Sequence, residues 1–218
     1  MPVRAVIFDF GGVILTSPLD AFARYEADNA LPPGFLRRLN ATDPDTNAWA
    51  RLERSEVDLD GFAELFEAEA AAAGHRVDGR TVLALLGGAL RPQMVQALRR
   101  CHDRLKTALL TNNNVPSEPA TGGGQAAGDP RFAGPMVDVL AHFDVIVESS
   151  RVGMRKPDTA IYRLVCDELG VEPAEAVFLD DLGVNLKPAR AMGIATIKVT
   201  DPDAAITELE AVVGFPLR

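Results

Sequence analysis

The sequence is poor in cysteine and in positive charge, and it has no long apolar run. Only Cys101 and Cys166 occur among 218 residues, in helical stretches and without the spacing of a disulfide framework or a metal site. The 22 basic residues face 31 acidic ones, and the net charge of −9 argues against general binding to a nucleic-acid backbone. No segment approaches 18 consecutive apolar residues, and the first residues do not resemble a signal peptide. These absences predict a reduced, cytoplasmic protein that binds neither membranes nor nucleic acid, and they leave monomer and homodimer open.

Hydrophobic residues make up 47% of the chain and fall into two periodic patterns. Short runs that are apolar rather than alternating lie at 5–8, 107–111, 144–149, 176–179 and 195–199. Stretches of helical period lie between or after them, at 91–105, 134–142, 157–170, 184–192 and 203–213. Strands that are apolar on both faces are typical of a parallel sheet covered by helices. The alternation therefore predicts an α/β fold, a doubly wound, Rossmann-like parallel sheet of five strands.

Residues 17–88 do not follow this alternation. They contain alanine-rich helical patterns, such as DAFARYEADNA and DGFAELFEAEAAAAG, and no convincing strand. The sequence thus predicts a small all-helical domain at 17–88, inserted after the first strand into a core domain of residues 1–16 and 89–218. Residues 117–130, rich in Gly, Pro and Ser, predict a long loop that is either functional or disordered.

Reactive side chains follow four of the predicted strands, where ligands of open parallel sheets bind. They are Asp9 after the first strand, Thr111 and Asn112 after the second, Lys156 beyond the third, and Asp180 and Asp181 after the fourth. Each alone is compatible with a turn, a helix cap or a solvated surface. Adjacent carboxylates behind a buried strand, however, repel each other unless a cation lies near. The ordered set of six predicts one site at this edge of the sheet.

The segments FDFGGV (8–13), LLTNN (109–113), VGMRKPD (152–158) and VFLDDLGVN (177–185) resemble the four motifs of the haloacid dehalogenase superfamily of hydrolases. Within that superfamily, residues 142–157 and 177–197 are most similar to the N-terminal phosphatase domain of soluble epoxide hydrolases. The resemblance covers nearly the whole chain, and it implies that the helical insert is the family's small cap. It also implies a phosphatase that acts on a small phosphorylated metabolite.

The resemblance and the chemistry of these side chains suggest the same roles. Asp9 is the expected nucleophile, and an aspartyl-phosphate is the expected intermediate. The expected Mg²⁺ ligands are Asp9, Asp181 and the main-chain carbonyl of Gly11, with Asp180 and Asn185 as a further ligand or as outer groups that orient them. The phosphoryl group is expected to contact Lys156, the Thr111 hydroxyl, the Asn112 amide and the backbone at Gly11 and Gly12.

One position departs from the family pattern. Most phosphatases of the superfamily have a second Asp two residues after the nucleophile, as general acid and base, and here that residue is Gly11. We interpret Gly11 and Gly12 as allowing the backbone to approach metal and phosphate closely. The missing acid predicts slow turnover of alkyl phosphates, because general acid catalysis contributes about 10²–10⁴-fold. Phosphates with low-pKa leaving groups should suffer least, unless a cap residue or a metal-bound water supplies the proton.

Three other functions compete with this prediction. A regulatory protein or simple phosphate binder would explain the missing acid, although it would not need Asp9. A metal-independent 2-haloacid dehalogenase would also use an aspartate nucleophile, but it gives no reason for paired acids at 180–181. A phosphonate hydrolase would need a cap lysine, and residues 17–88 contain none. Polar candidates for substrate selection in the insert are Arg24, Tyr25, Arg37, Arg38, Trp49, Arg51 and Arg54, of which Trp49 and Tyr25 favour packing roles.

Overall fold

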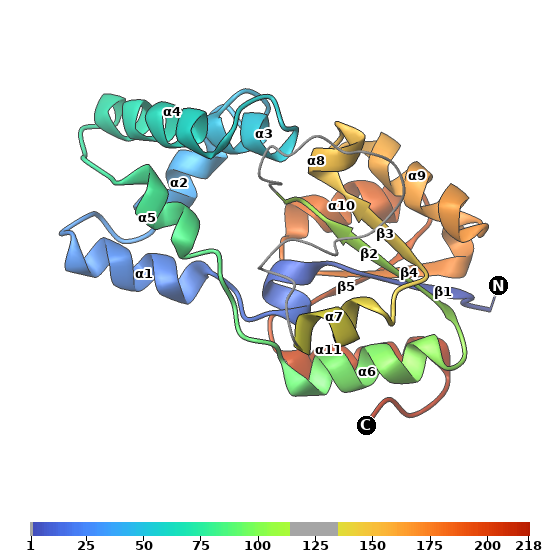
Figure 1. Ribbon diagram of the computed structural model, residues 1–218. Coiled ribbons are helices and arrows are strands. Elements are labelled where there is room, and N and C mark those ends of the chain that lie inside the picture. The colour runs from blue at the N-terminus through green and yellow to red at the C-terminus, as the bar shows by residue number, and fades with distance from the viewer. Residues whose placement is uncertain (1, 114–134) are drawn as a thin grey trace.

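The computed structural model describes residues 2–113 and 135–218, and its centre is one parallel sheet in the order β3-β2-β1-β4-β5 (Figure 1). The strands are β1 (Ala5–Phe8), β2 (Lys106–Thr111), β3 (Val145–Glu148), β4 (Ala176–Asp180) and β5 (Ala195–Lys198). The predicted doubly wound fold is confirmed. In the register, Phe8 lies opposite Leu109 of β2 and Leu179 of β4. The chain therefore leaves β1, β2 and β4 at the same edge. The loop predicted at 117–130 falls outside the described residues.

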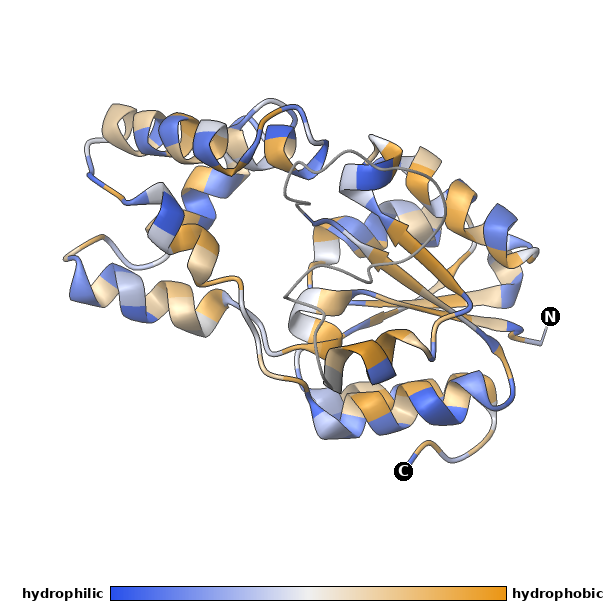
Figure 2. Cartoon of the chain, in the orientation of Figure 1, coloured by the Kyte–Doolittle hydropathy of each residue, from blue (hydrophilic) through white to orange (hydrophobic). Residues whose placement is uncertain are grey.

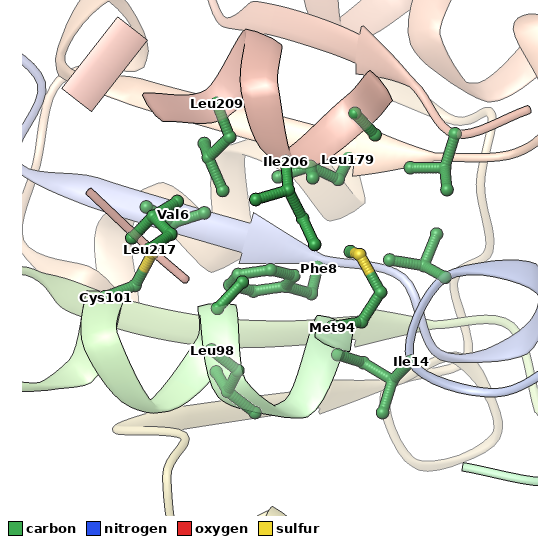
Figure 3. Packing of buried hydrophobic residues seen from close by; sticks show 14 of the residues in the cluster. Val6, Phe8, Ile14, Met94, Leu98, Cys101, Leu179, Ile206, Leu209 and Leu217 are labelled. Carbon is green, nitrogen blue, oxygen red and sulfur yellow. The ribbon is translucent and has the colours of Figure 1, made fainter. Parts of the chain in front are cut away.

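Helices cover both faces of the sheet. One face packs against α6 (Pro92–His102), α7 (Pro135–Leu140) and α11 (Pro202–Val213), and the other against α9 (Thr159–Leu169) and α10 (Gly183–Ala191). Figure 3 shows Phe8 between Leu98 of α6 and Ile206 of α11, whereas Ile7 belongs to the cluster on the opposite face. The strands are hydrophobic along most of their length and the helices are striped (Figure 2), as burial of strands on both faces requires.

Most element boundaries differ from the prediction by one to three residues, and two of these differences lie close to Lys156 in the chain. Pro157 does not begin a helix: α9 begins at Thr159, because the Asp158 side chain caps it by accepting a hydrogen bond from the Ala160 amide at 2.9 Å. The third strand ends before Ser149, where a short helix, α8 (Ser149–Val152), begins. Two further short elements are η1 (Phe10–Ile14), directly after β1, and η3 (Pro173–Glu175), before β4.

The helical insert, residues 17–88, consists of α1 (Leu19–Asp28), α2 (Phe35–Ala41), α3 (Ala48–Glu53), α4 (Leu59–Ala72) and α5 (Gly79–Ala84), and no strand lies within it. It has a hydrophobic cluster of its own, in which Phe62 stacks on Phe66 with ring centroids 5.2 Å apart. The segments that enter and leave it run side by side, joined by an antiparallel bridge between Leu15 and Leu90. No helix in the described ranges has the length and apolar character of a membrane span.

Candidate active site

Lys156 is the centre of the site. Its Nζ lies 2.8 Å from Asp9 Oδ1 and 2.8 Å from Asp180 Oδ2, and it donates a third bond to the Leu110 carbonyl at 3.0 Å. The residue is 1% exposed. Burial by itself would lower the pKa of Lys156, but the carboxylates of Asp180 and Asp9 outweigh it and raise that pKa above its ordinary value. The lysine is therefore held as a cation between the ends of β1 and β4.

Asp180 is fully engaged by the protein. Its Oδ1 accepts a bond from the Leu182 amide at 2.8 Å, and Asn185 Nδ2 lies 3.1 Å from Oδ1 and 3.0 Å from Oδ2. Asn185 is itself fixed, because its carbonyl accepts a 2.7 Å bond from the Tyr162 hydroxyl. Both oxygens of Asp180 thus contact donors of the chain, which favours a role in orienting Lys156 over direct metal ligation.

Three carboxylates meet beside this lysine. Asp9, Asp180 and Asp181 each offer an oxygen within 4.8 Å of the others, and no other such group of acids, histidines or cysteines occurs in residues 2–113 and 135–218. Burial raises the pKa of Asp9 to about 7 against the pull of Lys156, and burial and Asp180 raise that of Asp181 to about 6. One lysine leaves two negative charges unbalanced. A hard divalent cation with oxygen ligands fits this donor set.

The two glycines after Asp9 differ. Gly12 has φ +79°, and a Cβ there would lie 2.5 Å from Asp181 Cγ, so a side chain would displace that carboxylate. Gly11 has φ −69° and ψ 128°, and a Cβ there would meet nothing within 4 Å. Steric contact with Asp181 therefore requires glycine at position 12, whereas neither the backbone angles nor the space for a Cβ require it at position 11.

Thr111 and Asn112 lie at the end of β2, as predicted. The Thr111 hydroxyl is 3.5 Å from the Asn112 carbonyl, at the limit of a hydrogen bond, and the residue is nearly buried. The Asn112 side chain holds Lys156 on both sides: Oδ1 accepts from the Lys156 amide at 2.8 Å and Nδ2 donates to the Lys156 carbonyl at 2.9 Å. The sequence predicted a role for the Asn112 amide toward the phosphoryl group, but it did not predict these two hydrogen bonds of the side chain to the Lys156 backbone.

Glu53 and Arg155 are neighbours of the site that sequence analysis missed. Glu53 Oε2 lies 2.7 Å from Arg155 Nε and 3.3 Å from Asn112 Nδ2. Burial raises the pKa of Glu53, against the lowering effect of Arg155. Arg155 immediately precedes Lys156 in the segment VGMRKPD, so its place in the sequence could have predicted that it lies near the site. Glu53 ends a short helix among other charged residues, and nothing in its sequence context set it apart.

The aromatic candidates of the insert pack within it, as predicted. Trp49 is buried with its ring 4.6 Å from that of Phe62, and the Tyr25 hydroxyl accepts a 3.1 Å bond from the Asp78 amide. Arg54 pairs with Glu56 at 2.6 Å, also within the insert.

Comparisons with known proteins show the family and the fold of the chain. The family model of haloacid dehalogenase-like hydrolases matches residues 3–193. Bifunctional epoxide hydrolase 2 of Sus scrofa is 37% identical over an alignment of 229 positions, which covers 100% of this chain and 40% of that protein. Acyl-CoA dehydrogenase family member 10 of Mus musculus is 37% identical over an alignment of 221 positions, which covers 99% of this chain and 20% of that protein. The chain spans less than half the length of these two relatives. Sesquiterpene phosphatase astK of Aspergillus oryzae is 28% identical over 214 residues, or 97% of each chain.

Solved structures show the same fold. A HAD-like hydrolase from Porphyromonas gingivalis has a TM-score of 0.63 at 22% identity, over 96% of this chain and 98% of that chain. A HAD family enzyme from Bacteroides thetaiotaomicron, in complex with magnesium and inorganic phosphate, has a TM-score of 0.57 at 18% identity, over 90% and 93%. The predicted likeness to this superfamily and to epoxide hydrolases is confirmed.

Proposed function

The chain belongs to the haloacid dehalogenase-like hydrolases, and we propose that it is a Mg²⁺-dependent phosphatase acting on a small phosphorylated metabolite through an aspartyl-phosphate. The observation that carries the proposal is the placement of Asp9 and Lys156. A carboxylate at a sheet edge lies 2.8 Å from a buried ammonium, beside further acids. A related phosphatase and a magnesium and phosphate complex of the same fold give additional support.

In the proposed reaction each residue of the site has a separate role in phosphoryl transfer. Asp9 forms a bond to phosphorus as the bond to the leaving oxygen breaks, and water then hydrolyses the acyl phosphate. Lys156 faces the charge of the phosphoryl oxygens, and Thr111 and the Asn112 amide donate hydrogen bonds to them. Bound by Asp9, Asp181 and the Gly11 carbonyl, Mg²⁺ would supply charge neutralisation.

Gly11 gives the proposed enzyme its preference among substrates. The leaving oxygen must receive a proton unless it is a weak base, and position 11 provides no donor. Aryl and acyl phosphates should therefore be cleaved faster than alkyl phosphates. In the same proposal the helical insert of residues 17–88 is a cap domain over a core of residues 1–16 and 89–218.

Hydrolysis of 4-nitrophenyl phosphate with and without Mg²⁺ tests the function, and Asp9→Asn is the decisive variant. We expect release of 4-nitrophenol that EDTA abolishes and that Asp9→Asn lowers by about 10³-fold or more. Equal rates for the two proteins would exclude Asp9 as the nucleophile. Halide release from 2-haloacids in EDTA, without phosphatase activity, would instead identify a dehalogenase.

A non-catalytic phosphate binder is the second candidate, and the absent acid at Gly11 is the observation that favours it. Beryllium fluoride separates the two, because it adds to a competent aspartate nucleophile in the presence of Mg²⁺. We expect an adduct on Asp9 that stabilises the protein against heat and is absent from Asp9→Asn. A protein that binds phosphate but never forms the adduct would be a binder.

A further inference from the structure

Polar contacts join the insert to the sheet domain, and one of them is the Glu53–Arg155 ion pair, next to Lys156 in the chain. Besides the Glu53–Arg155 ion pair, the Ser55 hydroxyl donates to the Ser150 carbonyl at 2.9 Å, and Arg155 Nη1 donates to the Pro44 carbonyl at 2.8 Å. The hydrophobic cluster of the insert is separate from the two clusters of the sheet. The insert thus meets segments near Lys156 through one ion pair and several hydrogen bonds.

Glu53 connects this junction to the backbone of Lys156. The Asn112 Nδ2 group carries two hydrogens, one directed to the Lys156 carbonyl at 2.9 Å and one to Glu53 Oε2 at 3.3 Å. Glu53 therefore helps to fix the plane of the amide whose Oδ1 accepts from the Lys156 N–H. The same carboxylate neutralises Arg155, the residue immediately before the lysine. Side chains of Glu53 and Arg155 are only 17% and 20% exposed, which strengthens their interaction relative to a surface pair.

We propose that Glu53 is a positioning residue, through which the docked insert sets the place of Lys156 between Asp9 and Asp180. The carboxylate acts through Asn112 and Arg155, which hold the Lys156 backbone. When Glu53 is withdrawn with the insert, Asn112 loses a fixed partner and Arg155 loses its counter-charge. Docking of the insert is thereby coupled to the position of Lys156 between Asp9 and Asp180. The kinetic part of this inference rests on the proposed phosphatase function.

The test compares Glu53→Ala and Glu53→Gln with Glu56→Gln. Glu56 is the matched control, because it lies in the same segment but pairs with Arg54 and is 45% exposed. We expect Glu53→Ala to lower kcat and kcat/KM for 4-nitrophenyl phosphate together, by about tenfold, as for an interaction needed in the transition state. Glu53→Gln, which still accepts hydrogen bonds, should fall between this variant and the unchanged protein. Glu56→Gln should equal the unchanged protein.

Amide hydrogen exchange tests the inference without any turnover. The Lys156 amide, bonded to Asn112 Oδ1, should exchange about tenfold faster in Glu53→Ala and at the normal rate in Glu56→Gln. Unchanged exchange at Lys156 in Glu53→Ala would overturn the proposal, whether or not the protein is a phosphatase. If Glu53→Ala does not fold, Glu53→Gln decides the proposal instead. An exchange rate at Lys156 and a kcat that are both unchanged in Glu53→Gln would overturn it. If no protein of the series hydrolyses phosphate, the function fails while the exchange rates still decide the positioning role.

Discussion

The carboxyl edge of the sheet and the helical insert are stabilised in opposite ways. At the sheet edge, buried charges such as Lys156 and Asp180 are matched by ion pairs and hydrogen bonds. In the insert, stability comes from aromatic packing, with Trp49, Phe62 and Phe66 in mutual contact. Buried charges are costly and demand fixed partners, whereas an apolar cluster is cohesive without a fixed relation to its surroundings. The difference predicts that the packing of the insert is independent of the charge balance at the sheet edge.

This division accounts for the polar character of the junction between the regions. An apolar junction would merge the insert cluster with the core and make both one unit. The ion pair at Glu53 instead gives directional contacts that water can replace. If the insert moves in the proposed enzyme, separation of these polar contacts exposes no hydrophobic core. Each substitution below alters either the sheet edge or the insert, and the unaltered region is the internal control.

Replacing Lys156 should have the largest effect. In Lys156→Met, Asp9 and Asp180 remain buried without their cation, which costs about 3–5 kcal/mol for a broken buried pair. Turnover should fall by about 10³-fold, because the variant also loses the proposed donor to the phosphoryl group. Urea unfolding in EDTA and the 4-nitrophenyl phosphate assay measure the two effects.

The exposed Lys187 provides a control for loss of a lysine. Lys187→Met should change stability by less than about 0.5 kcal/mol and leave turnover unchanged. If Lys156→Met were as stable as Lys187→Met, the sheet edge would not depend on its charge balance, and the contrast with the insert would be wrong.

An acid at position 11 should have the next largest effect. A Cβ at Gly11 meets nothing within 4 Å and its φ is ordinary, so Gly11→Asp can be accommodated. We expect alkyl phosphate turnover to rise by about 10²-fold, since general acid catalysis is worth that much, while 4-nitrophenyl phosphate changes little. The rates on the two substrates measure it, with Gly11→Ala as the control for the added side chain. No rise on alkyl phosphates would mean that another group already supplies the proton.

The two glycines provide a third, smaller test. Gly12→Ala places a methyl group against Asp181 in a left-handed backbone, whereas Gly11→Ala adds the same atom in open space. We expect Gly12→Ala to bind Mg²⁺ about tenfold more weakly, because one proposed ligand is displaced. Gly11→Ala should bind Mg²⁺ as tightly as the unchanged protein. Mg²⁺-dependent stabilisation against heat measures both affinities. Equal affinities would exclude Asp181 as a ligand that depends on this close approach.

Sequence patterns predicted the parts of the molecule that depend on local order. The spacing of apolar residues predicted the strands and helices. The positions of Asp9, Lys156 and Asp181 after predicted strands indicated that they lie at one edge of the sheet. The pattern could not show that Asn112 and Glu53 meet, because 59 residues separate them and the contact depends on how the insert docks. Nor could it distinguish Gly11 from Gly12, because adjacent glycines look alike until their backbone angles are known. The start of α9 depended in the same way on whether Pro157 began the helix or Asp158 capped it.

The smallest expected effect tests whether the insert is an independent unit. Phe62→Leu should cost the insert about 1–1.5 kcal/mol, through looser packing against Trp49 and Phe66. Trp49 is the sole tryptophan, so its fluorescence in urea reports on the insert alone, while hydrogen exchange of the β1 amides reports on the sheet. Phe143→Leu, which loosens packing against Phe8 in the sheet cluster, is the reciprocal variant. We expect Phe62→Leu to move only the Trp49 transition and Phe143→Leu to move only β1 exchange. If either variant moves both probes equally, the two regions unfold as one cooperative unit, and aromatic packing in the insert does not make it separable from the site.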